Sequence, residues 1–287
     1  MLSRSIFWLW FSGLLLLVIG LFVRRRALAK ARGMDIVILL GPVFLAASIA
    51  VFGAEHLVSP RALMQLVPIW MPARLFWSYF VGFALLAAAV SISLMKLVRI
   101  SSWLLGLMFL LFVLMIHAPN VAASPRDRFM WTIALRETAF AGGAWALAAG
   151  SFALGARFMV AIPLAFFGIE HLLHPRFVLG VPLNKLMPAW VPAREVWGYL
   201  IGAILLAGGM WLLATRRSRP AAAWVGLVLT LITLLIYVPI LSKASGAAAL
   251  LEAVNYVADT LLFAGAVLCL AGSLPQGFGR MRRMVRS

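Results

Sequence analysis

Nine apolar runs, each 17 to 23 residues long, follow one another along this chain with little sequence between them. About 20 apolar residues are enough for a helix to cross the hydrocarbon of a bilayer, so each run can span a membrane. The composition agrees, because 64% of the 287 residues are hydrophobic and only 11% are charged. The chain is therefore predicted to be an all-α, polytopic membrane protein with no room for a soluble catalytic domain. The nine transmembrane helices are expected at residues 6–23, 35–56, 75–95, 100–117, 131–151, 157–173, 196–214, 221–241 and 250–272.

The basic residues predict how these spans are oriented. They outnumber the acids, 25 to 8, but they lie between the apolar runs, which indicates membrane topology rather than nucleic-acid binding. A basic cluster within residues 24–32 follows the first run, which we interpret as a retained signal anchor. With that cluster in the cytoplasm, 15 basic residues lie inside and 10 outside. The N-terminus is then predicted outside the cell (plasma or inner) membrane and the C-terminus in the cytoplasm.

Two sequence segments recur in the same order. FGAEHLVSPR at residues 52–61 returns as FGIEHLLHPR at 167–176, and PIWMPARLFWSY at 68–79 returns as PAWVPAREVWGY at 188–199, with seven identical positions in each pair. The pattern predicts an internal duplication. The expected domains are an N-terminal helix with a basic loop at 1–34, four-helix units at 35–151 and 157–272, and a basic tail at 273–287.

The Glu-His pairs of these repeats, Glu55-His56 and Glu170-His171, are the first candidate ligand-binding residues. A unit of four spans returns the chain to the face from which it started, so the two units are predicted to be parallel, with both pairs at the outer face. Ionisable groups are costly in a membrane, which favours a functional role. The alternative is that the pairs join helix ends through salt bridges. Their candidate charge partners are Arg61, Arg74, Arg176 and Arg194.

Aromatic residues at the start of the second helix of each unit are the next candidates. Trp and Tyr gather at the headgroup level of any membrane protein, and this alone explains their presence. Two prolines in each preceding loop would, however, break a helix and fold the aromatic side chains into a cap over a flat amphipathic molecule such as a quinone headgroup. The aromatic candidates are Trp70, Trp77, Tyr79, Trp190, Trp197 and Tyr199.

Two acids lie deepest in the predicted spans, Glu137 and Asp259, about 10 Å below the outer surface at 1.5 Å per residue. Glu137 has Arg136 beside it, whereas Asp259 has no adjacent cation in the sequence. A structural ion pair and a ligand or proton role both remain open for them. With a Glu-His pair and tryptophans at similar depth, each unit is predicted to have one pocket open to the outer leaflet.

Several chemistries are not indicated. The sequence contains no phosphate loop, nucleophile elbow or metal-ligand spacing, and its single cysteine, Cys269, excludes an intrachain disulfide. His56 and His117 could face each other as haem ligands in the first unit, but Tyr237 replaces His117 in the second, which disfavours haem. A non-enzymatic role without a metal is therefore favoured, and catalytic residues are unknown.

The repeated motifs G-x-E-H-L, V-P-x-W-x-P and W-x-Y-x-x-G resemble those of the DoxX-like family of four-helix membrane proteins. The resemblance covers residues 53–151 and 168–272. Many family members carry a glutamate three residues after the last glycine of this pattern, where this chain has Leu85 and Leu205. The resemblance implies a membrane component linked to quinone-coupled or other membrane redox complexes.

Three functions remain open from the sequence. The first is a quinone- or lipid-binding protein or accessory subunit of a membrane redox system, with quinone as the cofactor and a redox protein as the partner, besides the lipid bilayer. The second is a small-solute or proton transporter that uses the acids. The third is a structural or assembly protein without a cavity.

Overall fold

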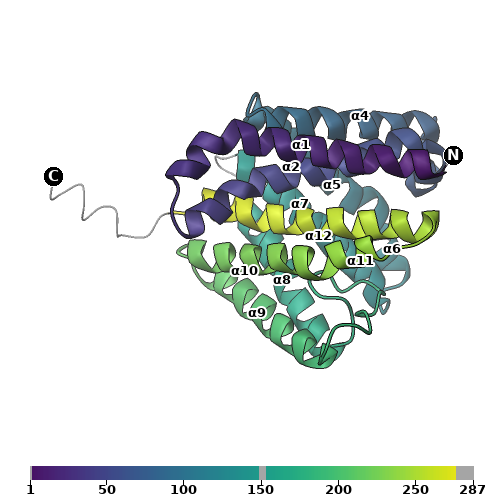
Figure 1. Cartoon of the computed structure of the whole chain (residues 1–287). Helices are drawn as coiled ribbons and strands as arrows, with labels where there is room; N and C mark the ends of the chain where they lie inside the picture. The colour runs from purple at the N-terminus through teal and green to yellow at the C-terminus, as the bar shows by residue number, and fades with distance from the viewer. Residues whose placement is uncertain (1, 149–152, 276–287) are drawn as a thin grey trace.

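The computed structural model describes residues 2–148 and 153–275, and long helices lying alongside one another make up nearly all of that part (Figure 1). The arginines predicted for the basic tail, from Arg280 onward, lie outside the described residues. The helices are α1 (Leu2–Lys30), α2 (Met34–Val58), α3 (Pro60–Leu63), η1 (Met64–Leu66), α4 (Arg74–Ser93), α5 (Val98–Phe112), η2 (Val113–His117), α6 (Ala118–Ala123), α7 (Arg128–Ala148), α8 (Ala153–Leu173), α9 (Arg194–Ala214), α10 (Arg219–Ile232), η3 (Thr233–Tyr237), α11 (Val238–Ser242) and α12 (Ala247–Ser273).

Eight of these helices are long and apolar enough to cross a membrane, where α5, η2 and α6 count as one continuous span, as do α10, η3 and α11. The chain is thus a multi-pass membrane protein by the length and composition of its helices. The predicted span at 131–151 is helical from Arg128 to Ala148 but is not among the eight, so the prediction of nine spans is supported in part. This helix, α7, carries Arg128, Arg136 and Glu137, which lower its hydropathy.

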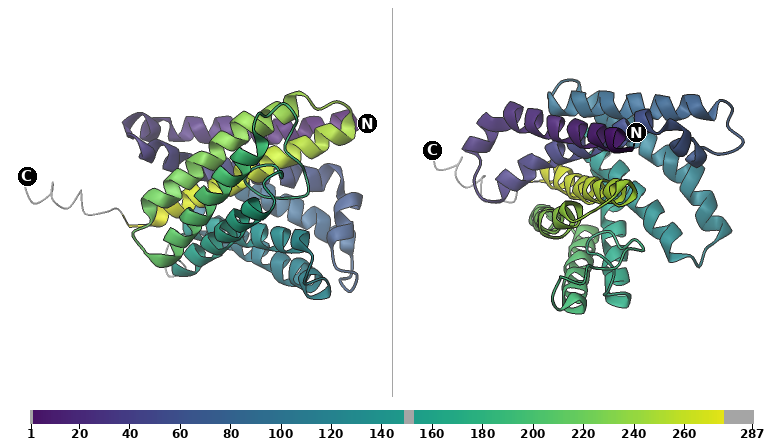
Figure 2. Two further views of the ribbon diagram at one scale, coloured as in Figure 1. Left: turned by 90° about the horizontal axis from the view of Figure 1, so that it is seen from below. Right: turned by 45° about the vertical axis from the view of Figure 1, so that its right-hand side comes forward.

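Helices α2 and α12 form the centre of the structure. Of the most apolar 18 residues, 72% are buried in α2 and 78% in α12, against 22–56% in the other six spans. The two helices can approach closely because glycine lies at their crossing, where a Cβ on Gly265 would come within 2.7 Å of the Leu45 nitrogen. Figure 2 shows α12 in yellow between α4 and α5 on one side and α8 and α9 on the other.

The fourth helices of the two predicted units are exchanged. Helix α7 packs mainly on α5 and on α8, the first helix of the second unit, while α12 packs mainly on α10 and on α2, the first helix of the first unit. Glycines mark both contacts, since a Cβ on Gly142 would lie 2.9 Å from the Ala156 carbonyl and one on Gly265 would lie 3.0 Å from the Gly41 carbonyl. Each predicted unit thus has the fourth helix of the other against its first helix, so the two are not separate four-helix bundles.

Candidate functional site

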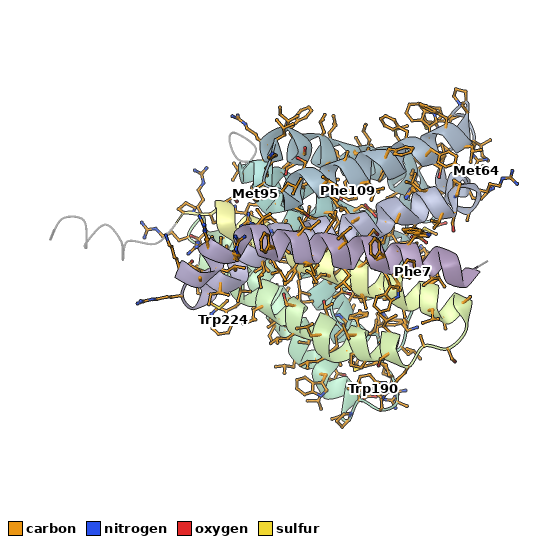
Figure 3. All side chains as sticks on the ribbon, turned by 45° about the horizontal axis from the view of Figure 1, so that its top comes forward. Phe7, Met64, Met95, Phe109, Trp190 and Trp224 are labelled. Atoms are coloured by element: carbon orange, nitrogen blue, oxygen red, sulfur yellow. The ribbon has the colours of Figure 1, made fainter. Side chains whose placement is uncertain are left out.

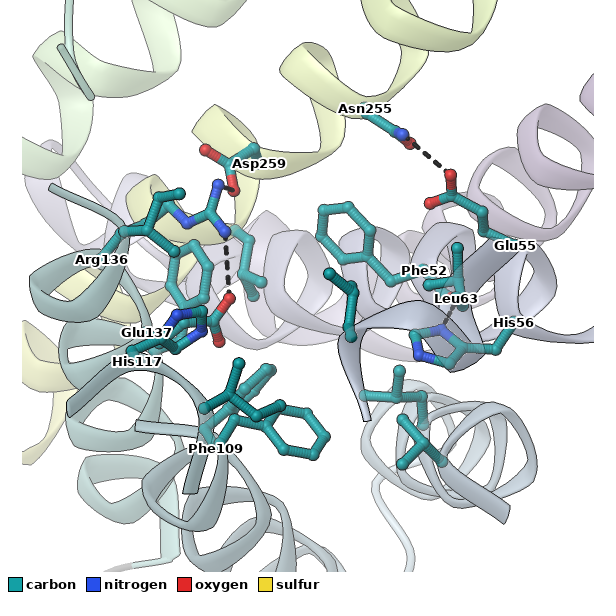
Figure 4. Close-up of a pocket in the computed structure, with 18 of the residues that line it drawn as sticks. Phe52, Glu55, His56, Leu63, Phe109, His117, Arg136, Glu137, Asn255 and Asp259 are labelled. Carbon is teal, nitrogen blue, oxygen red and sulfur yellow. Dashed lines mark hydrogen bonds and ion pairs between the residues drawn. The ribbon is translucent and has the colours of Figure 1, made fainter. Parts of the chain in front are cut away.

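A cavity of about 560 Å³ lies between α2, α4 and α5 on one side and α7 and α12 on the other (Figure 4). Most of its wall is apolar, with Phe52, Phe109 and Phe140 among the lining residues. Two groups of polar side chains project into it on opposite sides of the view, with Phe52 between them. The exchange of the fourth helices creates this site, because α12 contributes polar residues of both groups.

Arg136 lies at the centre of the first polar group. Its guanidinium contacts Glu137, with 3.1 Å from Nη2 to Oε1, and Asp259 of α12, with 3.1 Å from Nη1 to Oδ1. Asp259 is 5% exposed. Within residues 2–148 and 153–275, no hydrogen-bond partner is found for Arg136 Nε, Glu137 Oε2 or Asp259 Oδ2. Because buried polar atoms are costly without partners, these atoms mark a place where water or a ligand would bind.

Glu55 and His56 form the second polar group together with Asn255 of α12. The Asn255 Nδ2 donates to Glu55 Oε1 at 3.0 Å, and Asn255 Oδ1 has no hydrogen-bond partner among the described residues. His56 Nδ1 lies 2.9 Å from the Phe52 carbonyl, which can only accept. Nδ1 of neutral His56 must therefore carry the proton, and Nε2 is left as a hydrogen-bond acceptor.

The charge of the cavity limits what it can bind. Three carboxylates, Glu55, Glu137 and Asp259, line it together with one guanidinium, that of Arg136. Glu252, which also lines the cavity, has its own partner in Lys185, with 2.9 Å between Oε2 and Nζ. The guanidinium is already paired with Glu137 and Asp259, so the wall disfavours an anion and favours an uncharged or cationic molecule. The described residues hold no group of three or more His, Cys, Asp or Glu side chains arranged for a metal ion.

The second predicted unit has a longer loop at the corresponding place. Between the two recurring segments it has 11 residues, 177–187, where the first predicted unit has six, 62–67. We call residues 177–187 the plug. Val178 and Met187 anchor it by backbone hydrogen bonds to Lys185 and Arg176, both 2.9 Å, and residues 178–182 are all buried. The prediction of an open pocket in this second unit stays a prediction.

Arg128 holds the plug in place. Its guanidinium donates to the Pro182 carbonyl and, at 2.7 Å, to Asn184 Oδ1, and it lies 4.3 Å from the centre of the Phe177 ring. It also forms the ion pair of Glu170, with 3.3 Å between Nη1 and Oε2. The partner of Glu170 thus comes from α7 rather than from the predicted arginines.

The four predicted charge partners have other roles. Arg74 donates to the carbonyls of Val67 and Met64 at 2.9 and 2.8 Å, and Arg194 donates to the Met187 carbonyl at 3.5 Å. Arg176 pairs with Glu195 at 2.6 Å on the surface, and Arg61 is exposed. Arg74, Arg194 and Arg176 thus contact a loop carbonyl or a nearby exposed acid rather than the Glu-His pairs.

Only one of the six predicted aromatic residues lines the cavity. Trp77 does so, and its Nε1 donates to the Pro72 carbonyl at 3.1 Å. The loop prolines interrupt the helices as predicted, but the side chains do not fold over the site. The other aromatic side chains, Trp70, Tyr79, Trp190, Trp197 and Tyr199, are 40–70% exposed on the outside of the protein, as Figure 3 shows for Trp190. Their positions agree with the interfacial interpretation rather than with a cap.

The packing of the fourth helices, α7 and α12, aligns the two predicted units one residue differently from the alignment expected from the sequence, which pairs Glu137 with Asp259. Gly106 packs against Trp145, and the matching Gly226 packs against Leu268, so Trp145 corresponds to Leu268. Gly142 at the contact of α7 with α8 and Gly265 at the contact of α12 with α2 are matching positions, and they give the same register. In this alignment of the two predicted units, Asp259 matches Arg136 rather than Glu137.

Sequence reasoning did not include His117, Arg136 and Asn255 among the ligand-binding candidates, although all three line the cavity. It also missed Arg128, which contacts the plug and Glu170. The sequence suggests His117 only as a haem ligand, and it lines the cavity. The change from Arg136 to Asp259 becomes visible only in the register given by the glycine contacts, where opposite charges at matching positions suggest an ion pair between the two helices. Asn255 carries no such signal, since a single amide at a helix start is common.

Comparison with known proteins gives one match. A family described as a domain of unknown function (DUF8561) matches residues 45–136, about a third of the chain, from within α2 to Arg136 of α7. None of the comparisons assigns the chain to the DoxX-like family. No curated protein and no solved structure matches it.

Proposed function

We propose that this chain is a nine-span membrane protein made of one helix and two copies of a four-helix unit, and that the cavity of the first copy binds an amphipathic, membrane-soluble molecule. The recurring sequence segments support the duplication, and so do two matching details. A π-helical turn ends at His117 and at Tyr237, each two residues before a proline. Alanines in the left-handed conformation, Ala73 and Ala193, precede α4 and α9.

Two contacts support a full crossing by α7. Arg219 Nη2 lies 2.7 Å from Asp35 Oδ1, which joins the start of α10 to the start of α2. Asn255 near the start of α12 bonds Glu55 near the end of α2. The two residues of each contact lie at the same face of the membrane, so the chain between them must cross the membrane an even number of times. The number of crossings is six if α7 is counted and five if it is not. The buried ion pairs of α7 reduce the cost of its charges in the membrane.

Single-cysteine labelling tests this crossing. Two loop positions lie on either side of the α7–α8 hairpin, Arg126 before it and Lys185 after it. In a background of Cys269→Ala, Arg126→Cys and Lys185→Cys are both expected to react with a membrane-impermeant thiol reagent from outside intact cells. Arg99→Cys, at the other end of the helices, should react only after the membrane is opened. If 126 and 185 label from opposite sides, α7 does not cross.

The cavity carries the proposal of ligand binding. It combines an apolar wall with polar atoms that lack partners, which is the composition of a site for an amphipathic molecule. A lipid fits this description, as does a quinone or quinol headgroup, whose ring has oxygen atoms at both ends. The DoxX-like motifs also favour an accessory role in a membrane redox system. The excess of carboxylates argues against anionic ligands.

Filling the cavity should remove the ligand. Val81 of α4 is half-buried in the cavity wall, so Val81→Trp is expected to lower the amount of co-purifying ligand at least about tenfold by occupying its space. The measurement is mass spectrometry of small molecules retained by the protein in lipid nanodiscs.

Val90→Trp provides a matched control, because Val90 lies on the same helix with 44% of its surface exposed. This variant should retain the ligand. If no small molecule is retained by the unmodified protein, or if both variants retain it equally, the cavity is not a binding site and a structural role is favoured.

A further inference from the structure

The contacts of the plug indicate which chemical group the residues around it can bind. The Leu179–Gly180 peptide bond lies between two side chains of the second copy: the Tyr237 hydroxyl donates to the Leu179 carbonyl at 2.7 Å, and the Gly180 N–H donates to His171 Nε2 at 3.1 Å. The Gly180 carbonyl oxygen also lies 3.3 Å from His171 Nε2. One secondary amide is thus held from both sides. Its apolar neighbours, Val178 and Val181, are 0% and 1% exposed.

The side chains around this amide correspond to residues of the open cavity. His171 corresponds to His56, and Tyr237 corresponds to His117, in the recurring segments and the π-helical turns. Both histidines line the cavity of the first copy. The plug therefore lies where a molecule in that cavity would lie.

The contacts of Gly180 give a second, independent correspondence. A Cβ at this residue would lie 3.5 Å from the side chains of Leu229 and Thr260. Leu229 matches Phe109 on the third helix, and Thr260 matches Glu137 in the register given by the glycine contacts. Phe109 and Glu137 also line the cavity of the first copy. Four matching positions therefore surround the amide in the second copy and the cavity in the first.

We infer that the cavity of the first copy binds a secondary amide carrying apolar chains, that is, an uncharged N-acyl amide lipid. This inference rests on the proposed binding function and replaces the quinone with a narrower class. His56 Nε2 is available to accept the amide N–H, and the imidazole of His117, which matches Tyr237 in the sequence, can donate an N–H to the carbonyl. The shorter first loop leaves the space free for such a molecule. The excess of carboxylates disfavours free fatty acids and phosphate-bearing lipids of similar length.

A lipid is favoured over a peptide from another protein. The wall of the cavity is mostly apolar, and α2, α4 and α12, which contribute to it, are long and apolar enough to span a membrane. Acyl chains reach such a site from the bilayer without loss of other hydrogen bonds, whereas an extended peptide would bring several further backbone groups that need partners.

The test compares two probes that differ in one group. N-ethylhexadecanamide has an amide N–H where ethyl hexadecanoate has an ester oxygen, and the two are otherwise alike. The amide is expected to bind the full-length protein in nanodiscs about tenfold more tightly, because the ester leaves His56 Nε2 without a donor. Titration monitored by tryptophan fluorescence or calorimetry measures both affinities.

Variants of the two histidines test which residue causes the preference for the amide over the ester. His56→Leu should bind the two probes equally, and His117→Phe should lose affinity for both, because both probes carry a carbonyl oxygen. His174→Leu, at an exposed histidine outside the cavity, should keep the tenfold preference. If His56→Leu does not fold, the loss of affinity for both probes in His117→Phe serves as the test of the inference. Equal affinity of the two probes for the unmodified protein, or a preference that survives in His56→Leu, overturns the inference.

The outcomes separate this inference from the proposed function. If neither probe binds but a co-purifying molecule is lost in Val81→Trp, the cavity binds a ligand of another class, and only the amide assignment is wrong. If that molecule is a peptide, the lipid assignment is wrong. If neither a probe nor a co-purifying molecule is found, the proposed function fails as well.

Discussion

Arg136→Leu is expected to lower the free energy of unfolding by about 3–5 kcal/mol, because it leaves the buried carboxylate of Asp259 and the largely buried one of Glu137 without their cation. Glu137 and Asp259 each lie 3.1 Å from the guanidinium, and they come from α7 and α12 respectively. Removing the arginine would also weaken the attachment of α12 to α7. Unfolding in mixed micelles with increasing sodium dodecyl sulfate, followed by circular dichroism, measures the change.

Two further variants make this result specific. The triple variant Arg136→Leu, Glu137→Leu, Asp259→Leu should regain most of the lost stability, since apolar residues can replace a complete buried ion-pair group. Arg126→Leu, at an exposed position near the start of α7, should stay within about 0.5 kcal/mol of the unmodified protein. A loss in Arg136→Leu no larger than that in Arg126→Leu would show that the buried pairs contribute little.

Replacing the plug by residues 62–67 is expected to create a second binding site. The exchange removes Val178, Leu179 and Val181 from a space with walls like those of the first cavity. Binding of N-ethylhexadecanamide should then rise from one molecule per chain to two, and the protein without the amide should be less stable because three apolar side chains are lost from its interior. Stoichiometry from native mass spectrometry and the Tm with and without the amide are the measurements.

The reciprocal exchange provides the control. Residues 177–187 placed between Arg61 and Pro68 should fill the first cavity and abolish binding. A chain with both exchanges should again bind one molecule, now in the second copy. If the shortened second loop leaves the stoichiometry at one while the protein remains folded, the plug does not occupy a site equivalent to the cavity.

The sequence by itself determined the local structure and the environment. Apolar runs of about 20 residues form helices that suit a bilayer whatever surrounds them, so the positions of the long helices follow from hydropathy alone. Prolines stop helices through their own geometry, which is why the breaks around Pro68 and Pro188 are predictable. The recurring segments also indicate that Glu55-His56 and Glu170-His171 occupy equivalent helix ends.

Only the tertiary structure decided which residues meet. The sequence predicts Glu137 as a deep acid, but Arg136 joins it to Asp259 only because the fourth helices are exchanged between the units. Glu170 pairs with Arg128 for the same reason. Contacts of this kind depend on helix packing, and glycines such as Gly142 and Gly265 allow packing without specifying a partner in the sequence. The tertiary structure also decided where the five additional residues of the second loop fold, which hydropathy and spacing do not encode.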